Sequence, residues 1–227
     1  MKTRNFLDAL KEMPIVPALR GLKETEAKQV GQTLLDSGIT IFEVPIRTGN
    51  AAFSEIDTES LKCIEILIDS FGKYVNISAG TVMNISDLEI LAQYGINSCL
   101  SIYLNDKLLQ DAKKREFTFL PAVETITEAI TASKLGANGL KIFPSVFKEA
   151  DGHLNIYHSP GYIKYLSKFV SCPIIPSGNA FNKSLIKNYL SSGAKGINIG
   201  SQIYERNISL KELEIRIKNI VDIVKSD

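Results

Sequence analysis

A lysine and a glutamate that each interrupt an apolar run are the side chains best suited to chemistry. Lys141 lies within residues 139–143, and Glu43 lies within residues 40–44. If both runs are buried strands, alternation places Lys141 on the face opposite its two apolar neighbours. A buried amine without a counter-charge tends to be neutral and nucleophilic, and a nearby carboxylate can transfer protons for it. We predict a Schiff-base lysine and a proton-transferring glutamate, and the alternative is a purely structural ion pair.

Four glycines indicate the elements that must position these side chains. Each ends a helical pattern and precedes a short apolar run: Gly38, Gly95, Gly136 and Gly193. Glycine is the usual residue there because it adopts the left-handed conformation that ends a helix. Between successive glycines there is room for one further strand and helix. The sequence therefore predicts eight strand–helix units.

The predicted elements alternate along the chain. Strands are expected at residues 15–18, 40–44, 74–78, 98–100, 118–120, 139–143, 173–175 and 196–199. Helical spacing of apolar residues marks 25–36, 60–70, 125–135, 185–191 and 210–225. This alternation predicts an α/β fold with a parallel sheet, closed into a single-domain (β/α)8 TIM barrel over residues 1–227. An open doubly wound sheet is the alternative, but no GxGxxG or Walker loop follows the first strand.

Composition narrows the class of partner. Lysine and arginine total 26 against 25 acidic residues, so the net charge of +1 gives no broad attraction to nucleic acid or anionic membrane. The partner is expected to be a small molecule. Cys63, Cys99 and Cys172 form no CxxC pair, which argues against a disulfide framework or a cysteine-rich zinc site and indicates buried apolar positions. No apolar run is long enough for a signal or membrane segment, so we expect a cytoplasmic protein.

The carboxyl ends of barrel strands are where catalytic and binding residues are expected. Arg20, Arg47 and Thr81 follow the first three predicted strands. An arginine there suits a carboxylate or phosphate, although Arg47 could also be a solvated loop residue and Thr81 a helix cap. The loops after strands seven and eight are short and rich in small residues: Ser177, Gly178, Asn179, Gly200 and Ser201. Their amides and hydroxyl groups predict a phosphate site, with Ser201 opening the last helical segment.

Four segments, residues 18–21, 43–48, 79–82 and 140–145, resemble those of the 2-keto-3-deoxy-6-phosphogluconate and 2-keto-3-deoxy-6-phosphogalactonate aldolases. The resemblance to this KDPG/KHG aldolase family covers nearly the whole chain. It implies that Lys141 forms the Schiff base and that Glu43 moves protons through water. It further implies substrate carboxylate binding by Arg47 and Thr81, and a place for Arg20 at the pocket floor or phosphate end. The resemblance implies a homotrimer, and it implies no metal or other cofactor.

The resemblance also implies a reaction: cleavage of a 2-keto-3-deoxy-6-phospho sugar acid to pyruvate and glyceraldehyde 3-phosphate. Phe143 would keep the imine pocket apolar, and Ser177 would orient a substrate hydroxyl. The alternatives are a non-catalytic sugar-phosphate-binding barrel and another phosphate-binding barrel enzyme, such as an epimerase. The presence of both Lys141 and Glu43 favours the aldolase. The configuration at C4 and activity on 4-hydroxy-2-ketoglutarate stay open.

Three departures from the family pattern concern the pocket mouth. Asn179 replaces the second glycine of a usual pair, and Tyr103 follows strand four in place of a proline-containing segment. Residues 146–159 are longer than the corresponding family loop and contain His153 and His158. With Asp151 these histidines suggest a metal site, but a polar surface loop is the stronger expectation.

Overall fold

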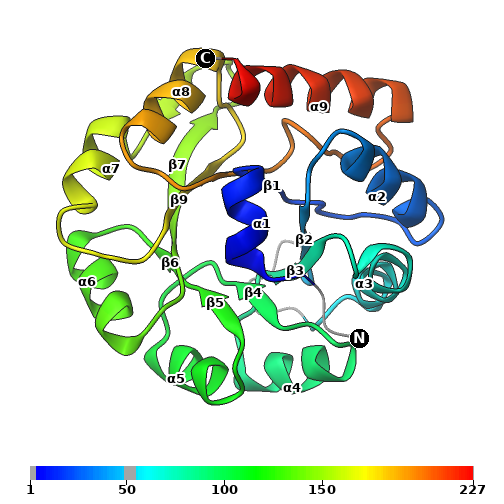
Figure 1. Ribbon diagram of the computed structural model, residues 1–227, viewed down its shortest axis with the longest axis horizontal. Helices are drawn as coiled ribbons and strands as arrows, with labels where there is room; N and C mark the ends of the chain where they lie inside the picture. The colour runs from blue at the N-terminus through cyan, green and yellow to red at the C-terminus, as the bar shows by residue number, and fades with distance from the viewer. Residues whose placement is uncertain (1–3, 49–54, 227) are drawn as a thin grey trace.

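In the computed structural model, which describes residues 4–48 and 55–226, strands and helices alternate. All the described helices except the first form a ring around the strands (Figure 1). The predicted domain ends, Met1 and Asp227, lie outside the described residues. The strands are β1 (Ile15–Pro17), β2 (Ile41–Pro45), β3 (Asn76–Gly80), β4 (Ser98–Leu100), β5 (Thr118–Leu120), β6 (Ala122–Val123), β7 (Leu140–Lys148), β8 (Leu154–Ile156), β9 (Ile174–Gly178) and β10 (Ile197–Ile199). The helices are α1 (Phe6–Glu12), α2 (Ala27–Asp36), α3 (Thr58–Phe71), α4 (Ile85–Gln93), α5 (Asp106–Lys114), α6 (Ile126–Leu135), α7 (Pro160–Leu166), α8 (Lys183–Ser191) and α9 (Leu210–Lys225).

The strands close into a barrel. Parallel pairing runs β1-β10-β9-β7-β6 and β2-β3-β4-β5. Strands β5 and β6 are separated only by Pro121, which has no N–H to donate, so together they fill one barrel position. A parallel bridge between Ala18 and Glu43 joins the β1 side to β2. The predicted parallel (β/α)8 fold is confirmed, and the four glycines predicted to end helices have φ values of 85°, 77°, 91° and 104°.

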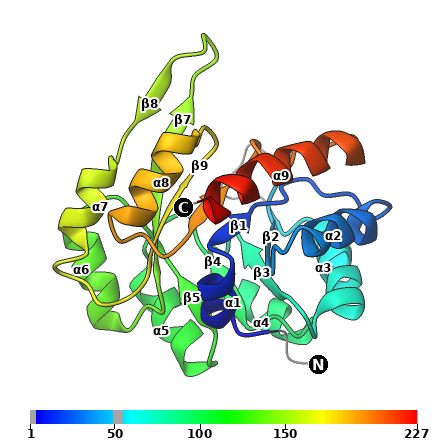
Figure 2. The same ribbon diagram turned by 45° about the horizontal axis from the view of Figure 1, so that its top comes forward.

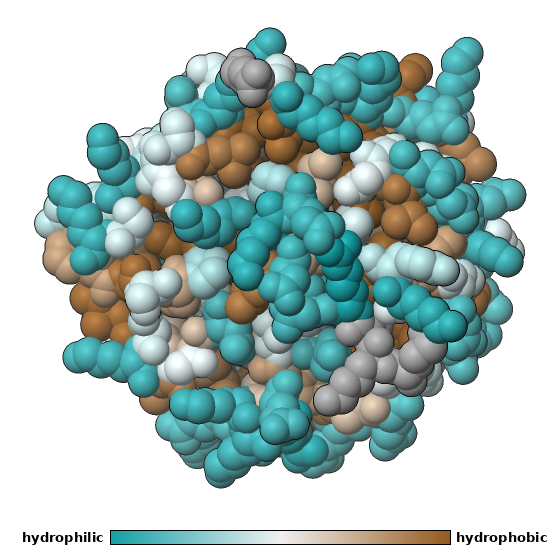
Figure 3. All heavy atoms as spheres, viewed as in Figure 1, coloured by the Kyte–Doolittle hydropathy of each residue, from teal (hydrophilic) through white to brown (hydrophobic). Residues whose placement is uncertain are grey.

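Helix α1 closes the barrel at the amino end of its strands. A separate core cluster joins α1 to the inward side chains of five strands: Phe6, Ala9, Leu10, Val16, Ile41, Leu100, Leu120 and Ile175. The outer side of α1 is polar, and the centre of this face of the molecule is largely hydrophilic (Figure 3). The sequence analysis did not predict α1. The buried polar side chains at this end, Asn76, Ser78 and Ser98, are hydrogen-bonded to one another beneath α1, so polar chemistry with a ligand is left to the opposite, carboxyl end.

Strand β7 extends well past the barrel and makes a hairpin with β8. Val146 pairs antiparallel with Ile156, and the hairpin projects beyond the ring of helices (Figure 2). The expectation of a plain surface loop over residues 146–159 is therefore incomplete. His153 is exposed, whereas His158 is buried and each of its ring nitrogens lies 2.8 Å from a backbone carbonyl oxygen. Within residues 4–48 and 55–226, no group of three potential metal-binding side chains occurs.

Candidate active site

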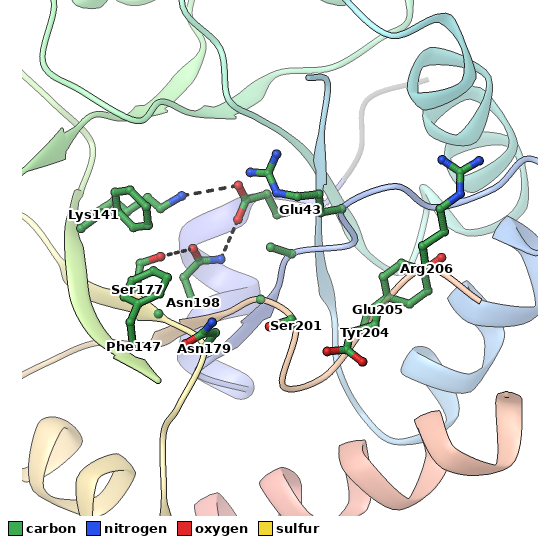
Figure 4. Close-up of a pocket in the computed structure, with 15 residues that line it drawn as sticks. Glu43, Lys141, Phe147, Ser177, Asn179, Asn198, Ser201, Tyr204, Glu205 and Arg206 are labelled. Atoms are coloured by element: carbon green, nitrogen blue, oxygen red, sulfur yellow. Dashed lines mark hydrogen bonds and ion pairs between the residues drawn. The ribbon is translucent and has the colours of Figure 1, made fainter. Parts of the chain in front are cut away.

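Lys141 and Glu43 meet at the bottom of the carboxyl end of the barrel. Strand β7 supplies the lysine and β2 the glutamate, and their side chains point toward each other (Figure 4). The Lys141 Nζ lies 3.6 Å from the Glu43 Oε1, and the two side chains are 7% and 2% exposed. Leu140 and Ile142 pack in the outer core against the helices, as alternation along the strand requires. A buried amine and carboxylate at this distance can exchange a proton directly or through one water.

A second pair of polar side chains holds the other oxygen of Glu43. The Asn198 Nδ2 donates to the Glu43 Oε2 at 2.6 Å and to the Val16 carbonyl oxygen at 2.9 Å. The Ser177 hydroxyl donates to the Asn198 Oδ1 at 2.7 Å. Sequence analysis missed Asn198, although it interrupts an apolar strand between Ile197 and Ile199 just as Lys141 interrupts its own. That shared pattern is the signal that would have found it.

Gly80, at the end of β3, makes room for the Glu43 carboxylate. A Cβ built on Gly80 would lie 2.1 Å from the Glu43 Oε1, which is far inside van der Waals contact. Any side chain at this position would displace the carboxylate from Lys141. The glycine that precedes Thr81 is therefore required by close approach and not by backbone conformation.

A cavity of about 400 Å³ opens above the Lys141–Glu43 pair. It is lined by Ala18, Arg20, Glu43, Lys141, Phe143, Phe147, Ser177, Gly178, Asn179, Asn198, Gly200, Ser201, Tyr204, Glu205 and Arg206. All the predicted site residues except Arg47 and Thr81 are in this set. The sequence analysis did not identify the segment 204–206 or Phe147, which comes from the hairpin. Tyr103 is not in the set, and its hydroxyl donates to the Met83 carbonyl oxygen at 3.0 Å.

Arg47 lies beside this cavity, in a buried ion pair. Its two terminal nitrogens donate to the Asp87 carboxylate at 2.8 and 2.9 Å, and Nη1 also donates to the Thr81 carbonyl oxygen at 3.1 Å. Thr81 has a φ of 58°, and the N-cap of α4 is Asn84, so Thr81 does not cap that helix. Arg20, which lines the cavity, connects it to Arg47, because the Arg20 Nη1 donates to the Arg47 carbonyl oxygen at 2.7 Å. Sequence analysis did not identify Asp87 as the acidic partner.

The loops after β9 and β10 line the far end of the cavity, but part of their donor capacity is already used. The backbone N–H of Asn179 donates to the Val146 carbonyl oxygen at 3.1 Å, and the backbone N–H of Gly200 donates to the Gly178 carbonyl oxygen at 3.0 Å. Ser201 does not open the last helix, since α9 begins at Leu210 with Ser209 as its N-cap. The predicted nest of loop amides is therefore only partly available to an anion.

Charged side chains surround the same end of the cavity. Besides Lys141, the cationic lining residues of the cavity are Arg20 and Arg206, and Arg206 Nη2 donates to Glu59 Oε2 at 3.2 Å. Glu205 contributes a carboxylate that lies 3.4 Å from Arg216 Nη1. Burial, followed by a hydrogen bond to Glu26, raises the pKa of the lining Tyr204 well above its usual range. Tyr204 is therefore uncharged at physiological pH, and its hydroxyl donates to Glu26 Oε1. The lining of the cavity thus carries charges of both signs.

The cysteines are not candidate nucleophiles. Cys63 and Cys99 are buried as predicted, whereas Cys172 is only partly buried. Burial raises the pKa of the Cys63 thiol to about 12 and that of Cys99 well above its usual value. A thiol is nucleophilic as its thiolate, so neither residue competes with Lys141.

In the part of the chain that the structure describes, no helix is long and apolar enough to cross a membrane.

Several known proteins resemble this chain over most of its length. The 2-dehydro-3-deoxy-6-phosphogalactonate aldolase of Escherichia coli (strain K12) is 26% identical over 201 residues, which cover 88% of this chain and 89% of the relative. A solved native KDPGal structure has a TM-score of 0.79 at 24% identity and covers 99% of this chain and 98% of its own. A Legionella pneumophila KDPG aldolase with pyruvate captured as a covalent carbinolamine has a TM-score of 0.76 at 20% identity, over 99% of both chains. The family model described as KDPG and KHG aldolase matches residues 7–220, so this chain belongs to that aldolase family.

Proposed function

We propose that this aldolase is a class I enzyme that cleaves a 2-keto-3-deoxy-6-phospho sugar acid to pyruvate and glyceraldehyde 3-phosphate. The observation that carries the proposal is the buried pair at the base of the cavity, with Lys141 Nζ 3.6 Å from Glu43 Oε1. An ammonium in this position can give its proton to the carboxylate and become a nucleophile. The carboxylate can then return that proton when a leaving group requires it.

The first half of the reaction builds the imine. The neutral Lys141 amine attacks the C2 ketone of the substrate, and the ketone oxygen takes up a proton to give a carbinolamine. Glu43, in its protonated form, gives a proton to the departing hydroxyl, which leaves as water. Phe143 lies beside the amine, with Lys141 Nζ 5.3 Å from the centre of its ring. This aromatic surface keeps water from one side of the imine.

The second half breaks the carbon–carbon bond. The ionised Glu43 takes the proton of the C4 hydroxyl, the C3–C4 electron pair moves into the protonated imine, and the aldehyde is released. The enamine that remains is protonated at C3 by the same carboxyl group. Water then attacks the pyruvate imine, and pyruvate leaves as Lys141 regains its amine.

The anionic ends of the substrate are assigned to the cations and loops around the cavity. We propose that Arg47 and Thr81 bind the substrate carboxylate, for which Arg47 would have to share its guanidinium with Asp87, which now holds it. Arg20, which lines the cavity, is assigned to the pocket floor or the phosphate end. We assign the phosphate to the far end, where Ser177, Gly178, Asn179, Gly200 and Ser201 line the cavity. The hydroxyl of Ser201 is the hydrogen-bond donor expected there, and Arg206 adds a positive charge.

We further propose a homotrimer, which the family resemblance implies, and a cytoplasmic location, which the lack of a long apolar run in the sequence favours. No cofactor is proposed, because Lys141 supplies the Schiff-base chemistry. The alternative functions, a non-catalytic sugar-phosphate-binding barrel or an epimerase, do not need the amine and carboxylate to meet.

Pyruvate release tests the proposed function. Both C4 epimers of the phosphorylated substrate, and 4-hydroxy-2-ketoglutarate, are supplied in turn, and pyruvate is followed with lactate dehydrogenase and NADH. We expect turnover of at least one phosphorylated epimer and none by Lys141→Met. The matched control is Lys148→Met, which changes an exposed lysine of the same strand and leaves turnover unchanged. Absence of pyruvate from all three compounds contradicts the proposal.

A further inference from the structure

Asn198 is buried, 2% exposed, and every polar atom of its amide has a partner. Its nitrogen faces two acceptors, the Glu43 Oε2 and the Val16 carbonyl oxygen, at 2.6 and 2.9 Å. Its oxygen faces the Ser177 hydroxyl, which donates to it at 2.7 Å. A flipped amide would set an oxygen against two acceptors, so only one orientation satisfies all three contacts.

This orientation decides how Glu43 carries a proton. An amide N–H can only donate, and it stabilises a carboxylate or carbonyl oxygen more than a carboxyl hydroxyl. The neutral form of Glu43 therefore has Oε2 as its carbonyl oxygen and its proton on Oε1. Oε1 is the oxygen that lies 3.6 Å from Lys141 Nζ.

We propose that Asn198 is a positioning residue that fixes the Glu43 carboxylate, with Ser177 as its support, so that all proton exchange passes through Oε1. This inference rests on the proposed Schiff-base function and adds to it a named path for the proton. Gly80 acts on the other side, because the space that a side chain would need there is occupied by Oε1 itself. The carboxylate thus accepts from Asn198 on β10 on one side (Figure 4) and lies against the backbone of Gly80 on β3 on the other.

The structure contains a second network that serves as a matched control. On β3 and β4, the Ser98 hydroxyl donates to the Asn76 Oδ1 at 2.9 Å, and both residues are buried. This serine–asparagine pair has the same chemistry and burial as Ser177 and Asn198. None of its hydrogen bonds reaches Glu43. Ser98→Ala therefore reports the effect of losing a buried hydroxyl without disturbing the proposed proton path.

Two measurements on pyruvate separate imine formation from proton transfer. Borohydride trapping after long incubation measures how much pyruvate is held as an imine, and loss of the methyl proton signal in D2O measures protonation of the enamine at C3. Asn198→Asp keeps the size of the side chain but replaces the donor with a carboxylate oxygen beside Glu43 Oε2. Two carboxylates this close bind a proton at a higher pH than one carboxylate alone. The acidic limb of the plot of exchange rate against pH should therefore move to higher pH by about one unit or more. Misplacement of a catalytic group by ~1 Å can cost on the order of 10²-fold in rate.

We expect Asn198→Asp to trap pyruvate within about twofold of wild type while its exchange rate falls about 10- to 10²-fold with the shifted acid limb. Ser177→Ala should slow exchange several-fold relative to Ser98→Ala. Wild-type exchange and an unchanged pH profile in Asn198→Asp would overturn the inference, as would equal losses of trapping and exchange. If Asn198→Asp does not fold, equal exchange rates for Ser177→Ala and Ser98→Ala overturn it. A wild-type protein that neither traps nor exchanges pyruvate overturns the proposed function itself.

Discussion

Removing the charge of Asp87 should destabilise the barrel far more than removing a comparable surface charge. Asp87 meets Arg47 in two hydrogen bonds of 2.8 and 2.9 Å, and the two side chains are 3% and 5% exposed. Its Oδ2 also accepts from the Met83 and Asn84 amides at 2.8 and 3.0 Å. Asp87→Asn keeps an oxygen for those amides, but it removes the negative charge and replaces Oδ1, which accepts from Arg47 Nη2, with an NH2 donor. Arg47 is left as a buried cation without the Asp87 carboxylate.

Breaking a buried ion pair from one side typically costs ~3–5 kcal/mol. For a chain of this size each kcal/mol lowers Tm by about 2–4 °C, so Asp87→Asn should lower Tm by roughly 6–20 °C. The matched control is Glu89→Gln on the same helix, which removes a partner of Arg115 in a 2.9 Å surface pair. That pair is 35% and 56% exposed, and its loss should cost about 1 kcal/mol or less.

Urea unfolding followed by far-UV circular dichroism measures both variants, since the chain has no tryptophan to report by fluorescence. The double variant Arg47→Met with Asp87→Asn should recover most of the stability lost by Asp87→Asn, because it removes the buried cation and keeps an acceptor for the Met83 and Asn84 amides. If Asp87→Asn unfolds within ~1 kcal/mol of Glu89→Gln, the buried pair does not have the role assigned to it.

The other predictions concern the cavity and the thiols. Glu43→Gln should lower turnover about 10²–10⁴-fold while pyruvate trapping persists, and near-wild-type turnover would assign Glu43 a structural role. Ser201→Asp should raise KM for a phosphorylated substrate more than for an unphosphorylated analogue, and Glu205→Gln should change the same ratio in the opposite direction; equal effects on both substrates would place the phosphate elsewhere. With its pKa raised to about 12, Cys63 has only about one thiolate in ten thousand at pH 8, so iodoacetamide should label Cys172 first in the native protein. Mass spectrometry of peptides checks this order, and labelling of Cys63 as fast as Cys172 would contradict its burial.

The parts of the fold that sequence could predict are those set by local pattern. Glycines at helix ends and alternation within strands determine where each unit starts and which face Lys141 occupies, because both depend on a few neighbouring residues. Helix α1 was missed because its helical face is made by packing across the barrel end, against strands as distant as the one containing Ile175. The β7–β8 hairpin was missed because β8 is only three residues long and lies outside the barrel, where its apolar side chains, Leu154 and Ile156, are exposed.

The same distinction applies to the site. Lys141 and Glu43 were predicted from their strands, and their meeting follows from barrel closure. Asn198 contacts Glu43 across 155 positions of sequence, and Arg47 contacts Asp87 across 40. Such contacts depend on strand register and helix placement, which composition and periodicity do not specify. Only the rule that a polar residue within a buried strand needs a partner would have indicated that Asn198 has a role.

Covalent capture of pyruvate tests the central claim most directly. The protein is incubated with pyruvate and borohydride, and its intact mass and peptide map are recorded. The account predicts one reduced pyruvate adduct per chain, located on Lys141, with no adduct on the exposed Lys148 of the same strand and none in Lys141→Met. An adduct on another lysine, or no adduct under conditions that label a control class I aldolase, would contradict it.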